Sequence, residues 1–246
     1  NYVSANLMVA VAGAPRAGGD GRKMVEIVVG RGEVAPVPIF DALNPHWQGP
    51  AVRITHKAPA QTHLVLNTKT FPATDPRFYA LKLLSGILGG QMSSRLFIKI
   101  RERRGLAYYV GSDVDNFHDT GLLSISAGLR TANVAEALKV MRREMTNMQT
   151  RPVTKEELRR VKDNLTGKMA LSLEGSFAIA HYLAEEAFYR KDILQPEEML
   201  ERFQSVSASD IIKVAETIFS PENVHISMIG PLGEKDEARF EKIVHS

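Results

Sequence analysis

The sequence predicts an α+β fold with two layers, in which helices pack on one face of a mainly antiparallel sheet. Two observations favour this class. Strand-like runs with a period of two come in pairs, and runs with helical spacing follow them, whereas a doubly wound fold would alternate strand and helix regularly. The chain has 246 residues, 44% hydrophobic and 24% charged, which is ordinary for a globular protein that buries a substantial core.

The first 50 residues are predicted to form a separate leading segment. Leu7–Ala12 is expected to be a buried strand that ends at Gly13. Prolines interrupt the polar stretch 34–50, which we interpret as a linker, although an ordered extended connection would show the same pattern. We therefore divide the chain into residues 1–50 and residues 51–246.

Two strands are expected to open the larger part of the chain. Residues 51–57 and 62–70 look like strands, the second with a clear period of two, and we expect them to pair with each other. In that arrangement His56 and His63 would face each other across a hairpin.

Two helices are expected next. Asp75 is a good N-cap and Pro76 suits the first helical turn, so a helix should begin there and end at Gly89-Gly90. A second helix is predicted for residues 93–103, and Gly105 closes it.

A hairpin and a long helix follow in the prediction. Residues 106–115 and 121–129 are expected to pair, with the turn-rich loop 116–120 between them. The helix at 132–149 repeats apolar residues, methionines among them, at intervals of three or four. A methionine stripe at this spacing indicates core packing rather than a cofactor site.

The last third of the chain is predicted to be mostly helical. Thr154 and Glu157 form a capping-box pattern at the head of a helical region that reaches Tyr189. The other expected features are a break at Gly167 or at 174–176, a helix after Pro196, a helix from 207 to 219, a strand at 223–229 and a charged end.

Charge and cysteine content exclude several classes of protein. A formal net charge of +3 is small for this length and argues against a nucleic-acid-binding protein. The absence of cysteine rules out disulfides, a cysteine nucleophile and thiolate metal sites, and it fits the bacterial periplasm as well as the cytoplasm. No apolar run is long enough to span a bilayer. Because the chain starts at Asn1, we expect that an upstream part, with any signal peptide, is missing.

The seven histidines do not predict a metal site. None lies in an HExxH or HxxEH motif. His181 and Glu185 are one helical turn apart, but no second histidine is close in sequence, so a hydrogen-bonded helix histidine is the better interpretation. His56 and His63 lack a carboxylate beside them. A phosphate loop and a serine elbow are missing as well, so we expect no cofactor and no metal ligand in this chain.

The segment Gly89–Tyr109 carries the strongest functional signal. Two glycines open it, a basic amphipathic run follows, and a pair of tyrosines comes after Gly105. Arg101 and Tyr108 stand at the two ends of a helix-to-strand turn, so a guanidinium and a phenol can share one surface. Such a pair can grip an extended peptide or polarise a carbonyl group.

Residues 71–129 resemble the C-terminal half-domain of the pitrilysin/insulysin family of inverted-motif (HxxEH) zinc peptidases, whose relatives include the mitochondrial processing peptidases. The resemblance rests on Leu88–Phe97, LGGQMSSRLF, and on Ile100–Val110, IRERRGLAYYV. Residues 2–13 are similar to the end of the preceding half-domain.

This resemblance implies a metal-free half that encloses a peptide together with a zinc-bearing half. It implies that Arg101 holds a substrate carbonyl or carboxylate, and that Tyr108 donates to the oxyanion formed when zinc-bound hydroxide attacks. HxxEH is missing here, so the zinc is expected in a partner half, either upstream on the same polypeptide or on a separate subunit. We predict that this chain alone is inactive.

The sequence therefore predicts the substrate-positioning half of a bacterial-type zinc metallopeptidase. Its expected partners are the zinc-bearing half and an extended peptide bound along a sheet edge, with no nucleic acid and no membrane span; a homodimer is a further alternative. The alternative function is a non-catalytic structural or assembly subunit related to processing-peptidase and respiratory-complex core proteins. A stand-alone peptide-binding module is a third. The presence of both Arg101 and Tyr108 favours the peptidase.

Overall fold

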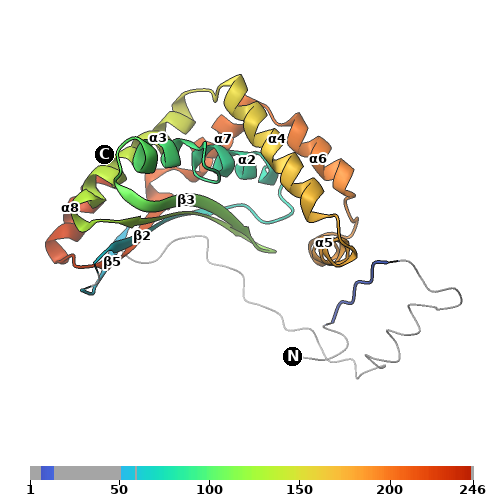
Figure 1. The fold of residues 1–246 in the computed structure, drawn as a ribbon, viewed down its shortest axis with the longest axis horizontal. Coiled ribbons are helices and arrows are strands. Elements are labelled where there is room, and N and C mark those ends of the chain that lie inside the picture. The colour runs from blue at the N-terminus through green and yellow to red at the C-terminus, as the bar shows by residue number, and fades with distance from the viewer. Residues whose placement is uncertain (1–6, 14–50, 59, 245–246) are drawn as a thin grey trace, which may run out of the picture. The chain divides into compact units, whose positions relative to one another are not determined.

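A computed structural model describes residues 7–13, 51–58 and 60–244 of the chain (Figure 1). The chain divides into two compact units. The first comprises residues 1–43 and 164–199, and the second comprises residues 44–163 and 200–246. The predicted linker at 34–50, and with it the division at residue 50, lies outside the described residues.

The second unit is built on a mixed sheet of five strands, which confirms the predicted α+β class. In spatial order the strands are β1 (Val52–His56), β5 (Val224–Gly230), β2 (Thr62–Thr70), β4 (Gly121–Leu129) and β3 (Ala107–Asn116). β1 runs parallel to β5, and the other neighbouring strands are antiparallel. The sheet formed by the described residues therefore has β1 and β3 as its edges.

The expected pairing of the first two strands is wrong. β5, from the far end of the chain, lies between them, so that Ile226 is opposite Val52 on one side and opposite Leu66 on the other. A period of two identifies a strand and its buried face, but it does not identify the neighbouring strand. The predicted hairpin of β3 and β4, in contrast, is confirmed.

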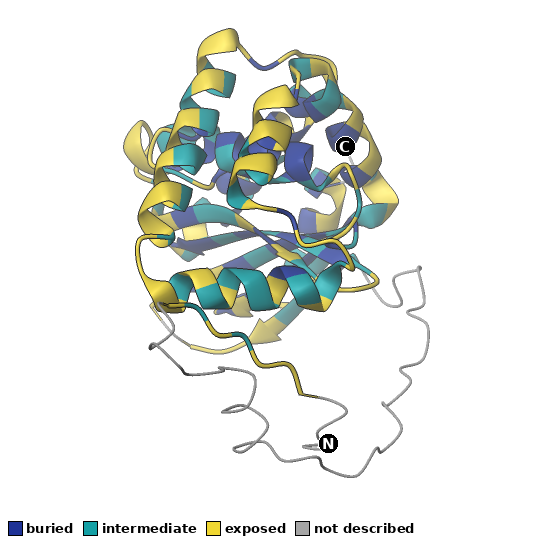
Figure 2. Cartoon of the chain, turned by 90° about the vertical axis from the view of Figure 1, so that its right-hand side faces the viewer, coloured by how far each residue is buried: buried dark blue, intermediate teal, exposed yellow. Residues whose placement is uncertain are grey.

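A layer of helices covers one face of the sheet (Figure 1). It contains α2 (Phe78–Leu88), α3 (Val134–Thr150), α7 (Ala208–Ile218) and α8 (Glu234–Val244). Figure 2 shows buried residues gathered where helices and sheet meet, with exposed residues on the outer helix surfaces. The methionine stripe of α3 is core, as predicted, because Met141, Met145 and Met148 are each 0% exposed.

α8 is the one helix of this layer that the sequence pattern did not predict. Its charged residues conceal an apolar side, on which Phe240 and Val244 are buried. The carboxylate of Glu237 accepts a hydrogen bond of 2.9 Å from the backbone N–H of Ile54, which attaches α8 to the edge strand β1. The charged end of the chain is thus part of the fold.

Three further helices follow α3 along the chain: α4 (Lys155–Ser172), α5 (Ser176–Tyr189) and α6 (Pro196–Ser205). Of the two predicted break points, the one at 174–176 is correct, and Gly167 lies inside α4. The predicted capping box is present, because the N–H of Glu157 donates to Thr154 Oγ1 at 3.1 Å and the N–H of Thr154 donates to Glu157 Oε2 at 2.9 Å.

Helix α2 begins at Phe78 rather than at Pro76. The Asp75 side chain accepts a hydrogen bond of 2.8 Å from the N–H of Arg77, and the Asp75 carbonyl accepts one of 3.0 Å from the N–H of Phe78. These bonds form a turn that precedes the helix. Its end at Gly89 is as predicted.

The predicted buried strand at Leu7–Ala12 is wrong. Residues 7–12 pair with no strand in the described part of the chain, and Leu7, Met8, Val9 and Val11 are between 48% and 71% exposed. An apolar run forms a strand only where a sheet offers it a neighbour and a buried face, because strand preference is mainly a preference for such surroundings.

Candidate functional site

Arg101 lies on a π-helix, η2 (Phe97–Glu102), where a regular second α-helix was predicted. The wider turn is visible in the hydrogen bond of 2.9 Å from the N–H of Arg103 to the Ile98 carbonyl, which spans five residues. Single π-turns are rare and often occur at functional sites. Ile100 anchors η2 in the core at 0% exposure, while the Arg101 side chain is exposed and its guanidinium carbon lies 5.0 Å from the centre of the Phe97 ring.

A tight turn connects η2 to the edge strand β3. Gly105 has a φ of +58°, a left-handed conformation that glycine adopts without a steric penalty. Its N–H donates to the Arg101 carbonyl at 3.1 Å, and the N–H of Leu106 donates to the Ile100 carbonyl at 2.9 Å. Gly105 therefore ends the helical segment as predicted, and it returns the chain to the sheet within a few residues of Arg101.

Tyr108 is the extra residue of a β-bulge. Ala107 is opposite Leu129 and Tyr109 is opposite Gly128, so β3 advances by two residues while β4 advances by one. Tyr108 has no cross-strand partner in this register, and its side chain is 50% exposed. Among the described residues its hydroxyl has no hydrogen-bond partner. A bulge of this kind can re-aim a side chain, and bulges are frequent next to active sites.

The neighbouring Tyr109 is fixed in place by two contacts that the sequence did not predict. Its hydroxyl lies 3.1 Å from Nδ1 of His63, on β2. Its ring lies over Gly128, where a Cβ atom would be only 2.5 Å from a ring carbon. The sequence shows two adjacent tyrosines, but the register of the sheet is needed to see that their contacts differ.

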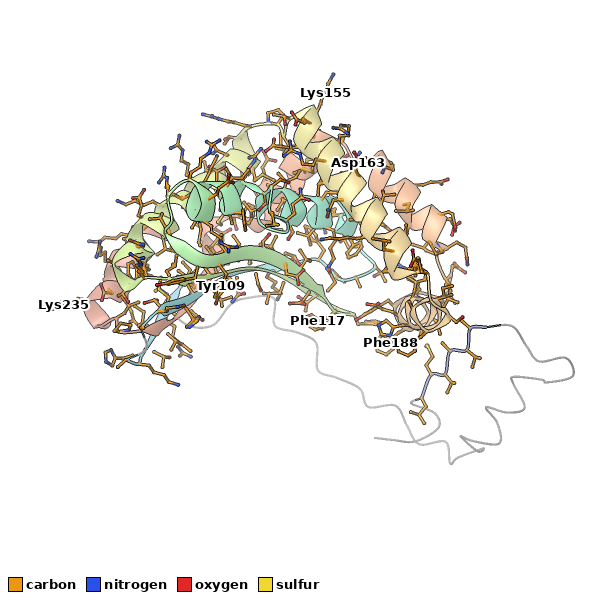
Figure 3. All side chains as sticks on the ribbon, in the orientation of Figure 1. Tyr109, Phe117, Lys155, Asp163, Phe188 and Lys235 are labelled. Carbon is orange, nitrogen blue, oxygen red and sulfur yellow. The ribbon has the colours of Figure 1, made fainter. Side chains whose placement is uncertain are left out.

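The sheet face opposite the helices is polar. Figure 3 shows Tyr109 on this face, and strand alternation places the outward-facing residues of each neighbouring strand beside it. The Ser124 hydroxyl donates to Asn67 Oδ1 at 2.8 Å across two of these strands. The polar side chains of the face, all exposed or half-buried, are Arg53, Thr55, His63, Asn67, Lys69, Tyr109, Asp113, Asp115, Ser124, Ser126, His225 and Ser227. Tyr108, on the edge strand β3, therefore adjoins a polar face whose side chains form hydrogen bonds, whereas Arg101 lies on η2, just before this strand.

An ion pair ties the residues before η2 to the start of α4. Arg95 donates to both carboxylate oxygens of Glu157, at 2.8 and 3.1 Å. Burial alone would raise the pKa of Glu157, but the bonds from Arg95 and from the N–H of Thr154 outweigh it and lower the pKa to about 2. Glu157 thus both caps α4 and forms an ion pair with Arg95, just before η2.

The described residues do not fit a zinc ion, since they hold no group of three or more metal-ligating side chains. His56 and His63 do not face each other: Nδ1 of His56 is 2.9 Å from the Leu232 carbonyl oxygen, and His63 contacts Tyr109. In the first unit, the His181 ring stacks on Phe177 with a centroid distance of 6.4 Å.

None of the helices in the described ranges combines the length and apolar character needed to cross a bilayer.

Comparison with protein families and curated proteins gives one consistent result. The family described as "Peptidase M16 inactive domain" matches residues 20–165. An uncharacterized zinc protease of Streptomyces coelicolor is 33% identical over 193 residues, which are 78% of this chain and 42% of that protein. An uncharacterized zinc protease of Rickettsia felis is 34% identical over 172 residues, 70% of this chain and 41% of that protein. The chain thus spans about two fifths of the length of these relatives.

Solved structures share the fold. The peptidase M16 inactive domain from Pseudomonas fluorescens matches with a TM-score of 0.71 at 22% identity, over 80% of this chain and 48% of that one. A chain of complex III from Candida albicans matches with a TM-score of 0.72 at 15% identity, over 92% of this chain and 56% of that one. At these identities the likeness concerns the fold alone.

Proposed function

Because this chain belongs to the peptidase M16 family through its inactive domain, we propose that it is the substrate-positioning half of a zinc peptidase. It binds and orients a peptide, and the hydrolytic chemistry belongs to a zinc-bearing half, either upstream on the same polypeptide or on a separate subunit. The finding that the described residues do not fit a zinc ion is consistent with this division of tasks.

The bulge at Tyr108 carries the proposal. The phenol is attached to the one residue of β3 that the β3–β4 ladder does not pair, and its hydroxyl is exposed without a partner among the described residues. A hydroxyl without a partner among these residues can donate to a substrate carbonyl oxygen and bind it more tightly as negative charge develops there. Hydrogen-bond donors aimed at such a developing charge contribute strongly to catalysis.

Arg101 supplies the second contact. Its guanidinium stays charged and carries five N–H donors in a fixed plane, which suits a substrate carboxylate or backbone carbonyl. The Phe97 ring, 5.0 Å away, supports one side of that plane and leaves the N–H groups at its rim available. The Gly105 turn keeps Arg101 and Tyr108 on adjoining elements.

The peptide itself is proposed to lie along β3. This strand is an edge of the sheet that the described residues form, so its outer backbone groups can pair with an extended peptide as an added strand. Tyr108 is at the start of β3, and a peptide added there would pass the phenol before it reaches the exposed Asp113 and Asp115.

A structural or assembly role is the alternative, and the fold likeness to a complex III chain is consistent with it. Such a subunit needs the fold and a partner surface, but it does not need a phenol on a bulge. The two functions differ in whether the Tyr108 hydroxyl affects a rate.

Reconstitution of the two halves tests the proposal. The zinc-bearing half and this chain are assayed separately and together for cleavage of an unstructured fluorogenic peptide. We expect neither half to cleave alone and the mixture to be active. A complex that size-exclusion chromatography shows to be assembled, but that cleaves no peptide, would favour the structural subunit.

The two adjacent tyrosines provide a matched pair of variants. Tyr108→Phe removes only the hydroxyl and should lower kcat about 100-fold, the usual effect of losing one oxyanion donor. Tyr109→Phe makes the same change in a residue of similar exposure whose hydroxyl is already bonded to His63, and it should stay near the wild-type rate. Equal rates for the two variants would remove the role of Tyr108.

A further inference from the structure

A charged hollow of about 270 Å³ lies on the helical side of the second unit, between η2 and α3. We call it the η2–α3 pocket. From η2 and the turn after it come Lys99, Arg103 and Arg104, and α3 contributes a single face, since its lining residues recur at intervals of three and four. The peptide-positioning site does not use any of these residues.

The pocket has a surplus of positive charge. Its lining includes five basic side chains and two carboxylates, a formal surplus of three, which equals the net charge of the whole chain. Both carboxylates are already paired, Glu144 with Lys99 at 2.6 Å and Glu136 with Arg104 at 2.6 Å.

Three cations of the pocket have no ion-pair partner among the described residues: Arg103, Lys139 and Arg143. All three are exposed, and they line one hollow from α3 and from the turn after η2. Like charges so placed repel each other unless an anion lies between them, so the arrangement favours an anionic ligand.

The buried carboxylate of Glu144 adds a second requirement. Its side chain is 1% exposed, and its Oε1 atom accepts hydrogen bonds from Lys99 at 2.6 Å and from the Asn147 amide at 3.1 Å. Its Oε2 atom is buried without a donor in the described part of the chain. A buried acceptor without a partner is costly, so a ligand that brings a donor to this wall of the pocket would be favoured.

We infer that the η2–α3 pocket binds a terminal phosphate group in its monohydrogen form. The charged oxygens of such a group accept hydrogen bonds from Arg103, Lys139 and Arg143, and its P–OH group donates to Glu144 Oε2. A hollow of about 270 Å³ suits a small phosphate compound rather than a large cofactor. This inference is independent of the proposed peptidase function.

Calorimetric titration of the 246-residue chain with pyrophosphate at 150 mM salt tests the inference. We expect saturable binding, and each of the variants Arg103→Gln and Arg143→Gln should weaken it about tenfold, since each removes a charge-assisted hydrogen bond. The control is Lys155→Gln, an exposed lysine at the start of α4 that lies outside the pocket (Figure 3). Absence of saturable binding, or equal weakening by Lys155→Gln, would overturn the inference.

Two comparisons complete the design. Sulfate resembles phosphate in shape but carries no O–H donor at neutral pH, so it should bind about tenfold more weakly than inorganic phosphate if Glu144 accepts from the ligand. Equal affinity for sulfate and phosphate would contradict the role of Glu144. Circular dichroism and the melting temperature establish that each variant is folded before its affinity is compared.

A lipid headgroup with a terminal phosphate presents the same chemistry as a free compound. Co-sedimentation with vesicles that contain phosphatidic acid separates the two sources. If the chain binds the vesicles, and if both pyrophosphate and the Arg103→Gln substitution weaken that binding, the ligand is a lipid phosphate. If calorimetry shows binding of pyrophosphate but the chain does not co-sediment with vesicles, the ligand is a free phosphate compound.

Discussion

At the scale of single residues, Tyr108 and Tyr109 show how one sheet register gives two identical side chains different roles. Their exposures are similar, 50% and 44%. Tyr109 has a cross-strand glycine beneath its ring and a histidine at its hydroxyl, whereas Tyr108 has neither. Residue type and exposure would not distinguish them, and their difference arises from the single extra residue in β3.

Gly128→Ala tests the contact that holds Tyr109. The new Cβ would lie 2.5 Å from a carbon of the Tyr109 ring, so the ring must move and its bond to His63 is strained or lost. We expect the free energy of unfolding to fall by about 1–2 kcal/mol in urea titration, as for other overpacked sites. In a Tyr109→Ala background the same substitution should cost much less, because nothing then opposes the Cβ.

Gly111→Ala is the control for that substitution. Gly111 lies on the same strand as Tyr109, and a Cβ there would meet only the Gly89 carbonyl oxygen, at an ordinary 3.6 Å. We therefore expect a smaller loss of stability than for Gly128→Ala. If both alanines destabilise equally, the cost comes from glycine replacement in the sheet and not from the Tyr109 ring.

Arg101→Ala tests the other proposed substrate contact in the reconstituted enzyme. Loss of a charge-assisted hydrogen bond should lower kcat/KM by about 10- to 100-fold, while the urea midpoint stays unchanged because the side chain is exposed. Arg159→Ala, which removes an arginine that is 72% exposed on α4, should leave kcat/KM unchanged. A drop in both variants would indicate a general loss of charge attraction.

At the scale of elements, the start of α4 should make stability depend on pH. The pKa of Glu157 is lowered from its ordinary value of 4.5 to about 2 in the folded protein. Its contribution is therefore complete above pH 4.5 and is lost as the pH falls from 4.5 towards 2. We expect a loss of roughly 1–2 kcal/mol across this window, less than the full shift implies because the side chain keeps 26% of its exposure.

Glu157→Gln should remove that part of the acid dependence, as measured by urea unfolding at successive pH values. The neighbouring Glu156→Gln, an exposed change on the same helix turn, should keep the wild-type dependence. An unchanged profile for Glu157→Gln would mean that other carboxylates govern acid unfolding.

Local sequence patterns predicted most helices and strands. They failed where the structure depends on a contact between residues distant in sequence, or on backbone hydrogen bonds that side-chain spacing does not reveal. The Thr154 capping box joins residues three apart, and the α3 methionines repeat at helical spacing, so the sequence displays both patterns. The apolar spacing around Ile100 fits an α-helix and a π-helix alike, and backbone hydrogen bonds such as the one from Arg103 to Ile98 distinguish them. The placement of β5 beside β1 depends on residues that are far apart along the chain, which no local period encodes.

At the scale of the whole molecule, residues 51–246 are proposed to form one domain. All strands of the sheet and the four helices that cover it lie within residues 52–244. We expect a fragment of residues 51–246 to fold with the same near-ultraviolet circular dichroism as the full chain. A fragment that binds a hydrophobic dye and unfolds without cooperativity would show that the first 50 residues complete the core.

The candidate site was predictable only in part for the same reason. Arg101 and Tyr108 are close in sequence, so a short motif was enough to single them out. The support from His63 and the pocket formed by η2 with α3 join segments that are distant along the chain. Such pairs become visible only when the sheet order and helix packing are known.

The bulge in β3 also has an evolutionary consequence. Deletion of Tyr108 would leave Ala107 and Tyr109 opposite Leu129 and Gly128, in an uninterrupted ladder. A loss of three nucleotides could thus abolish the phenol while the core and the sheet persist. Selection for protein stability alone would not remove such a deletion. A lineage can therefore lose the proposed function of this half in one mutation and still keep the fold, which remains available for another function.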